Sequence, residues 1–352
     1  MGNYKKFLTG AFIFFTLVFS AHAAPKVEKQ PKWVTDYSSV YPENEWVVVP
    51  VVSAPNKQAA EANAIGALAA VFKVDVQAAS SAAQSMSQTL SNGKSELGKN
   101  SSLASQTNTS TSVSGLMGVV IDSWTSKDGT VYALARINRK SGAAAYAGII
   151  KENDSVILAL EKDAAANPGT FEAYESLAVA SNLAVLTDGY LEILSVLNPA
   201  VRASVTVGYG NANAVKRLAL DNTRSIVIRI EIKGDVNGRI KKAFQEVFTK
   251  QGFRTSDAPA ANAYTLDVDF TISPVDLQGQ SNKFARYELN AAIGSAGGTE
   301  LFAFSGNSRV GHTSYSEAEQ RTLRRAESSI GDIDDEESFT SVFNSYLVSL
   351  LK

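Results

Sequence analysis

Few residues of this chain have side chains suited to catalysis or metal binding. The sequence contains no cysteine and only two histidines, His22 and His312. The lack of cysteine excludes thiol nucleophiles, disulfides, iron–sulfur ligands and Cys-based zinc sites. A zinc site built on one histidine would have to recruit carboxylates alone, which is unusual for zinc. We therefore expect no metal and no cofactor.

His312 is the candidate general base. A Ser-His-Asp triad would need it beside an activated serine, and the nucleophile pattern G-x-S-x-G is absent. Ser314-x-x-Glu317 begins two residues after His312 and matches a capping box, as does Ser316-x-x-Glu319. The spacing favours a turn that begins a helix over a catalytic base.

Asp267 and Asp269 are the best candidates for a paired-carboxylate hydrolase, because both lie on one face of an expected strand. Their neighbours Leu266, Val268 and Phe270 are apolar, so the aspartates are most simply the solvated face of that strand. A carboxylate-based hydrolase stays open as a less favoured function.

An acidic run covers 332–337, but it lacks the alternating carboxylates and the glycine of a calcium loop. Negative charge ahead of a helix beginning near Ser338 is favoured by the helix dipole, which predicts a solvated cap. The glycine pair Gly234 and Gly238 follows a strand and precedes a helix, yet neither phosphate-binding glycine motif is present. Capping by Asp235 or Asn237 is the simpler interpretation.

Two basic clusters remain. One is Lys241-Lys242, and the other comprises Arg321, Arg324 and Arg325. Solvated helix faces are favoured over anion binding for both. The whole chain has 33 basic and 35 acidic residues and a net charge of −2, which disfavours a nucleic-acid binder.

The N-terminus has the pattern of a cleavable signal peptide. Lys5 and Lys6 precede an apolar run over 7–19, and Ala21 and Ala23 supply the small residues that signal peptidase needs. We expect cleavage between Ala23 and Ala24. The run is short for an uncleaved membrane anchor, and no cysteine is present to carry a lipid. Cleavage removes two lysines and His22, so the mature net charge is −4.

The rest of the 352-residue chain, of which 45% is hydrophobic, is predicted to form an α+β protein with two domains. The first domain, 31–140, has a β-prone run at 46–52 with Pro50 inside it, then a helix capped by Asn56. A polar tract at 77–114 is expected to be a long loop or a polar strand pair rather than a binding segment. A hairpin follows, with strands at 116–124 and 131–138 around an Asp-Gly turn.

A helical hairpin at 141–199 is predicted to connect the domains, broken at Asn167-Pro168-Gly169 and ended by Asn198-Pro199. The second domain, 203–352, should contain a mainly antiparallel sheet with helices on one face. Strands are expected at 203–209, 226–233, 264–272, 284–293 and 301–310. Helices are expected at 239–251, 317–329 and 338–351. After signal cleavage, we expect no membrane-spanning helix.

The order of elements in 31–140 resembles the LPP-twenty family, the twenty-kilodalton-lipoprotein-like domain of bacterial envelopes. The resemblance rests on Pro31-Lys32-Trp33-Val34 and on the hairpin Trp124 to Ala135 with its Asp-Gly turn. This chain departs from the lipoprotein members because it has no N-terminal cysteine. The second domain is similar in outline to the periplasmic α+β modules of TolB and flagellar assembly protein T.

The resemblance implies an envelope interaction or assembly protein with no catalytic residues. We therefore expect a periplasmic, non-enzymatic protein whose partners are envelope proteins, including outer-membrane or flagellar-type assemblies. The alternative is a small-molecule or glycan-binding protein, which rests on the expectation that Trp33, Tyr37 and Tyr41 are exposed.

Overall fold

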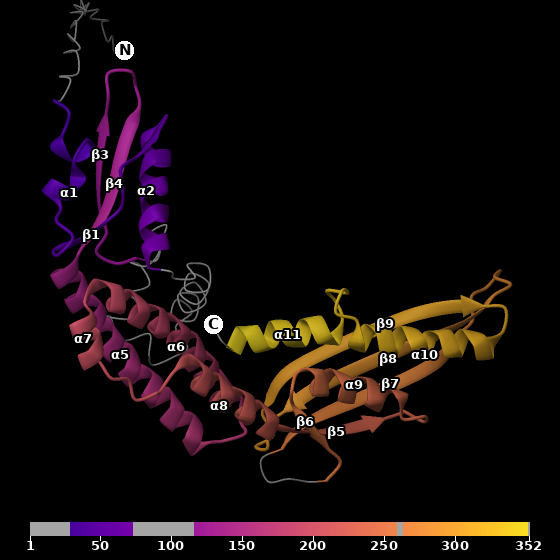
Figure 1. Ribbon diagram of the computed structural model, residues 1–352. Coiled ribbons are helices and arrows are strands. Elements are labelled where there is room, and N and C mark those ends of the chain that lie inside the picture. Colours follow the sequence, from indigo (N-terminus) through magenta and orange to yellow (C-terminus); the bar gives the residue numbers. More distant parts are fainter. Residues whose placement is uncertain (1–28, 73–115, 259–262, 351–352) are drawn as a thin grey trace, which may run out of the picture.

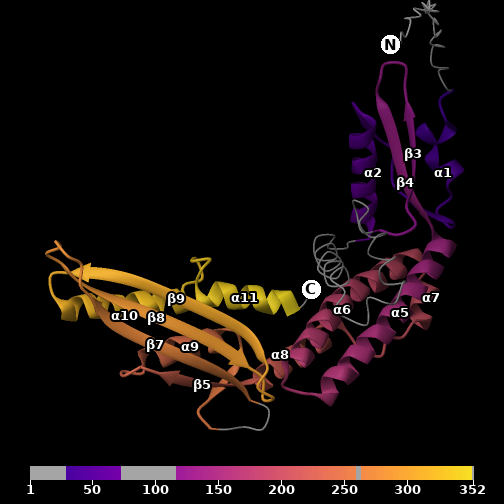
Figure 2. The ribbon, with the colours of Figure 1, turned by 180° about the vertical axis from the view of Figure 1, so that it is seen from behind.

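The computed structural model describes residues 29–72, 116–258 and 263–350. The predicted signal peptide with Ala21, Ala23 and Ala24, and the polar tract at 77–114, lie outside these residues. A small sheet at one end is followed by a pair of long helices and then by a larger sheet at the other end, in a bent arrangement (Figures 1 and 2). The α+β class is confirmed.

The small sheet consists of β1 (Trp46–Val48), β2 (Val52–Ala54), β3 (Val120–Thr125) and β4 (Val131–Asn138). The first three strands each pair antiparallel with β4. The run expected at 46–52 is divided in two, and both parts pair with β4. Pro50 explains the division, because proline has no N–H to donate to a strand ladder.

Three helical segments accompany this sheet: η1 (Lys32–Val34), α1 (Tyr37–Val40) and α2 (Lys57–Val71). The predicted cap of α2 is present, since the Asn56 side chain accepts a hydrogen bond from the Ala59 N–H at 2.8 Å. Small residues such as Ala60 and Ala64 are fully buried, which lets α2 approach the sheet closely.

The predicted helical hairpin is α5 (Arg139–Ala166) and α6 (Phe171–Leu197). The two helices share one hydrophobic core with the small sheet, so the connector and the first sheet form a continuous packed unit. The strand expected at 203–209 is wrong: α7 (Pro199–Ser204) occupies its beginning, and α8 (Ala212–Ser225) follows without a strand between them. Asn198 and Asn211 cap these two helices.

α6 is long and apolar enough to cross a membrane by length and composition. That composition has a different explanation in the folded chain, because thirteen of its residues are buried against the protein, including Leu183, Tyr190 and Leu194. The absence of a spanning segment after signal cleavage therefore stays a prediction, and burial of α6 favours it.

The larger sheet has the order β6-β5-β7-β8-β9. Its strands are β5 (Val227–Lys233), β6 (Arg254–Ser256), β7 (Tyr264–Val275), β8 (Lys283–Gly294) and β9 (Glu300–His312). The three long strands pair antiparallel as predicted, whereas β5 is parallel to both of its neighbours. A helix connects β5 to β6, as a parallel crossover requires.

The predicted helices of this module are α9 (Arg239–Lys250), α10 (Tyr315–Gly331) and α11 (Phe339–Leu350). They contribute buried side chains to one core with the sheet, and its centre is aromatic: Phe244 packs edge-on against Phe339, with ring centroids 4.8 Å apart, and Phe343 stacks beside Phe339.

Phe171, the first residue of α6, joins the helix pair to the larger sheet. Its ring belongs to the second core and lies 4.4 Å from Tyr264 and 5.8 Å from Phe253, measured between ring centroids. Its backbone N–H, which α6 itself cannot satisfy, donates to the Tyr264 hydroxyl at 2.9 Å. One residue thus ties the start of α6 to the second module by packing and by hydrogen bonding.

Replacing Phe171 with alanine should lower the free energy of unfolding by about 3 kcal/mol, because a fully packed ring is lost from the core. Denaturant unfolding followed by circular dichroism measures this change, and small-angle scattering should report a more variable angle between the modules. Val185→Ala is the matched control, since Val185 lies on the same helix with 40% of its surface exposed. Equal effects of the two substitutions would contradict the assigned role.

Candidate functional site

Asp267 and Asp269 project from the uncovered face of the larger sheet, as the strand alternation predicts. Both are exposed, while the alternating residues Leu266 and Val268 are buried. With Glu300 and Ser305 they line a surface depression of about 400 Å³. Lys233 Nζ lies 3.5 Å from an Asp269 oxygen, in a largely exposed pair. The depression gathers acidic groups in water rather than enclosing a reacting bond.

His312 ends β9, and its imidazole Nδ1 lies 3.3 Å from the Thr313 hydroxyl. The Ser314 hydroxyl accepts the Glu317 N–H at 3.3 Å, so the predicted helix cap is present. The Glu317 carboxylate bonds Arg321 Nε at 3.1 Å, which lowers the pKa of Glu317. The surroundings of His312 are those of a strand-to-helix turn.

The acidic run forms local turns ahead of α11. Asp332 and Asp335 each accept a backbone N–H two residues further on, at 3.0 Å. The Ser338 hydroxyl then accepts the Ser341 N–H at 3.2 Å and caps the helix. Over 29–72, 116–258 and 263–350, no three histidine or acidic side chains are grouped as metal ligands.

The loop between β5 and α9 differs in detail from the prediction. The N-cap position of α9 is Gly238, not Asp235 or Asn237. The Asp235 carboxylate nevertheless caps the helix from outside, because its Oδ2 accepts the Lys241 N–H at 2.8 Å. Gly234 has φ +84°, and a Cβ there would lie 1.9 Å from the Phe270 carbonyl oxygen. This glycine is required by close approach of two backbones, not by a phosphate.

Several members of the basic clusters are ion-paired. Lys241 Nζ lies 2.6 Å from Asp257, while Arg321 and Arg324 both approach the Glu317 carboxylate, at 3.1 and 3.5 Å. These pairs are largely solvated, so each contributes little to stability. Helix-face solvation accounts for them, as expected.

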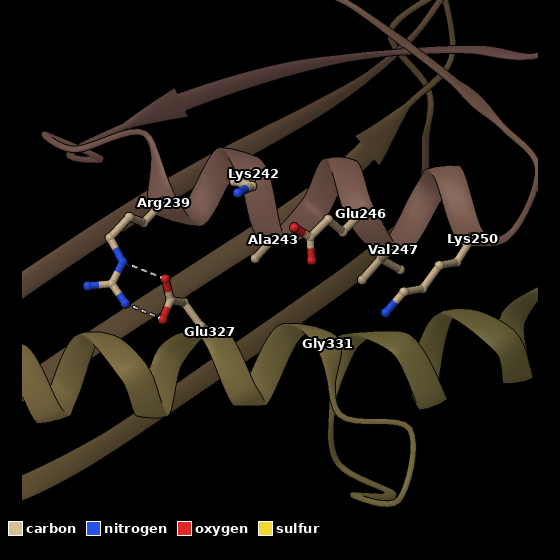
Figure 3. A pocket seen from close by; sticks show the side chains of 8 residues that line it. All are labelled: Arg239, Lys242, Ala243, Glu246, Val247, Lys250, Glu327 and Gly331. Carbon is tan, nitrogen blue, oxygen red and sulfur yellow. Dashed lines mark hydrogen bonds and ion pairs between the residues drawn. The ribbon is translucent and has the colours of Figure 1, made fainter.

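Lys242 belongs to a groove between α9 and α10 that the sequence did not indicate (Figure 3). Its volume is about 370 Å³, and Arg239 and Glu327 close one end through two hydrogen bonds of 2.6 and 2.5 Å. The guanidinium is held by this fork, and the bonds to Glu327 raise the pKa of Arg239. Lys242 and Lys250 line the groove on either side of Glu246, one helical turn from each, and no ion pair within 4.0 Å engages either lysine among the described residues.

The aromatic residues near the N-terminus do not form an open platform. Trp33 is only 8% exposed, so its expected exposure is wrong. Tyr41 packs edge-on against Trp46, with 5.7 Å between ring centroids. The Arg136 guanidinium lies 4.3 Å from the Tyr41 ring and 4.4 Å from the Trp46 ring. Tyr37 and Tyr41 are half-buried, so of the three aromatic residues behind the glycan-binding alternative, Trp33 is buried and none is fully exposed.

Asp122 completes this cation–π cluster. Its Oδ2 accepts both the Tyr41 hydroxyl at 2.8 Å and Arg136 Nε at 2.9 Å. Burial and the bond to Asp122 raise the pKa of Tyr41. The cluster fastens the segment around α1 to the strands β3 and β4. The sequence signal that could have revealed this cluster is the presence of the charged residues Asp122 and Arg136 inside the two strands of the predicted hairpin.

A second polar network crosses the helix pair. Asp188 on α6 accepts the Tyr209 hydroxyl at 2.7 Å and the Ala212 N–H at 2.8 Å. Asp154 on α5 accepts the Gly208 N–H at 2.7 Å. Burial of the ring, with the bond to Asp188, raises the pKa of Tyr209. Both aspartates therefore hold the segment that precedes α8 against the helix pair.

Comparison with known proteins identifies no family: no family model matches the chain, and no curated protein matches it. A secreted protein from Helicobacter pylori is 15% identical, with a TM-score of 0.38, and the match covers 80% of this chain and 96% of that one. A minor lipoprotein from Acinetobacter baumannii is 13% identical, with a TM-score of 0.26, over 35% and 92% of the two chains. These neighbours are secreted or lipoprotein components, but both TM-scores are too low to establish a common fold. The resemblance to the LPP-twenty family stays a hypothesis.

Replacing Arg136 with lysine should destabilise the small sheet by about 1 kcal/mol, because an ammonium cannot stack on two rings and bond Asp122 in the same geometry. Chemical unfolding followed by tryptophan fluorescence measures the loss. Arg286→Lys is the control, since Arg286 is half exposed and lies 3.8 Å from Glu288. A stability equal to that of the unmodified chain would show that the cluster contributes nothing.

Proposed function

We propose that this chain is an exported, non-catalytic protein of the bacterial periplasm that acts as an interaction or assembly module. Its partners would be other envelope proteins, including outer-membrane or flagellar-type assemblies, and not nucleic acid. The observation that supports this most strongly is the joint at Phe171, which gives the two modules a defined geometry. A fixed spacing between binding surfaces is useful for assembly and unnecessary for chemistry at a single site.

The use of the charged residues supports the same proposal. Asp122, Asp154 and Asp188 accept hydrogen bonds that fasten segments of the fold. Of the sequence candidates for catalysis, Asp267 and Asp269 lie exposed in one open depression, whereas His312 lies apart from them at the end of β9. A hydrolase would need two such groups converging on one bond.

The groove between α9 and α10 is the surface that we propose for a partner, and its occupant would be an acidic segment of another envelope protein. Lys242 and Lys250 project from α9 with no ion pair to carboxylates in the described residues. The groove lining has three basic residues, Arg239, Lys242 and Lys250, against the two acidic residues Glu246 and Glu327, so an acidic segment would balance its charge. The net-negative charge of the whole chain would disfavour non-specific binding of anions.

The variant Lys242→Glu/Lys250→Glu should reduce capture of the partner about tenfold or more, because like charges would then face each other. The measurement is chemical cross-linking of the tagged, exported chain in cells, followed by quantitative mass spectrometry. Lys127→Glu/Lys151→Glu is the matched control, with two exposed lysines elsewhere. The groove is not the binding surface if both variants lose the same cross-linked proteins. The proposed interaction function is contradicted if the unmodified chain cross-links to no envelope protein.

Export is tested separately by the mature N-terminus. The chain recovered from the periplasm should begin at Ala24, because Ala21 and Ala23 satisfy the small-residue requirement of signal peptidase. Intact-mass measurement of the fractionated protein gives the answer. A chain that keeps residues 1–23 and stays with the inner membrane would support an anchor instead.

A further inference from the structure

The free edge of the larger sheet is formed by β9, a strand of thirteen residues. Among the described strands β9 pairs only with β8, so the backbone groups on its other side are available. Long edge strands are normally protected by proline, short length, inward charge or a β-bulge. The irregularity of β9 lies before Phe302, and the pairing with β8 is regular from Phe302 to His312. No proline interrupts β9. The edge is therefore suited to pairing with another strand.

Two charges on β9 lack a carboxylate or ammonium partner in the described chain. Arg309 lies directly opposite Arg286 of β8, which is an unfavourable like-charge pair. Its guanidinium instead lies 5.6 Å from the centroid of the Phe284 ring, near the outer limit of a cation–π contact. Glu300 at the other end of the strand is exposed and forms no ion pair within the part described.

Both charges lie on the uncovered face of the sheet. The residues Ala303, Ser305, Asn307 and Arg309 alternate with buried or half-buried positions. The register between β8 and β9 is irregular at this end. Ile293 pairs with Phe302 and Gly294 pairs with Glu300, so Leu301 has no partner on β8. Glu300 therefore follows Ala303 on the same face.

From this pattern we infer that β9 pairs antiparallel with β9 of a second copy of this chain, centred on Gly306. A two-fold axis perpendicular to the sheet keeps the uncovered faces of the two copies on the same side. Ala303 then lies opposite Arg309 of the second copy, and Ser305 lies opposite Asn307. The small Ala303 side chain leaves room for the guanidinium to reach Glu300, the next residue on that face.

The symmetry repeats each contact, so the pairing gains two Glu300–Arg309 ion pairs and two polar Ser305–Asn307 pairs. It also moves each Arg309 away from Arg286. On the opposite face, Phe302 lies across from Val310 and continues the apolar layer under α10 and α11. The two sheets become one ten-stranded sheet. This inference concerns a different surface from the groove and does not depend on the proposed function.

The mature full-length chain should show a dimer mass that dissociates on dilution, measured by sedimentation velocity. Arg309→Glu should raise the dissociation constant about tenfold or more, because Glu300 would then face a like charge. Combining it with Glu300→Arg should restore dimerisation. Thr271→Glu, exposed on the same face but two strands inward on β7, is the control and should leave the dimer intact. Failure of the charge swap to restore a dimer would overturn the assigned contacts.

The register is tested by cross-linking, which the absence of native cysteine makes unambiguous. Gly306→Cys should form an intermolecular disulfide on oxidation, because self-paired residues have Cα atoms about 4.5 to 5.5 Å apart. A Cβ at Gly306 meets no atom closer than 3.5 Å, so the variant should fold. Asn290→Cys on β8 should stay uncross-linked. The inference would be overturned by a chain that stays monomeric at every concentration and forms no Gly306→Cys disulfide. It would also be overturned by a dimer in which Gly306→Cys fails to cross-link, because the two copies would then pair through another surface or register.

Discussion

The structure depends on one helix, α6, whose two ends serve different hydrophobic cores. Leu183, Leu194 and Leu197 pack with the small sheet and α5, whereas Phe171 at the beginning lies among the aromatic residues of the second module. A helix is stiff over this length, so the positions of the two cores are coupled through it. The neighbouring turn is fastened as well, because Asn222 of α8 accepts the Gly169 N–H at 2.8 Å.

The same constraint explains how the polar residues are used. A bent chain of modules has several segments that cross from one element to another, and each leaves backbone donors to be satisfied. Asp154 and Asp188 satisfy donors of the segment before α8, and Asp235 satisfies a donor at the start of α9. Carboxylates committed to backbone N–H groups stabilise the fold and are not free for proton transfer. The described residues contain one histidine, His312, and the few catalytic candidates expected from the sequence are matched by structural roles for several of its aspartates.

Local signals predicted most of the fold. Asn56 before an alanine-rich run, the Asp-Gly turn of the hairpin and the alternation of Leu266, Val268 and Phe270 each specify an element through neighbouring residues alone, and each is present. The errors occur where tertiary contacts decide. The segment 205–211 has a β-prone composition, but Asp154 and Asp188 hold its end against the helix pair and no strand neighbour lies there. Trp33 reads as exposed beside polar residues, yet it is buried.

Features made by pairs of distant elements could not be predicted. The groove between α9 and α10 brings Arg239 to Glu327 across 88 residues of sequence, and no spacing rule connects them. The opposed arginines of β8 and β9 appear only when the register is known. A fold without disulfides must keep such surfaces in place through its cores, and the second core does so with a dense cluster of aromatic rings around Phe339 and Phe343. Phe302 and Phe304 of β9 pack against Phe339, so the packing that stabilises the module also fixes the position of its edge strand.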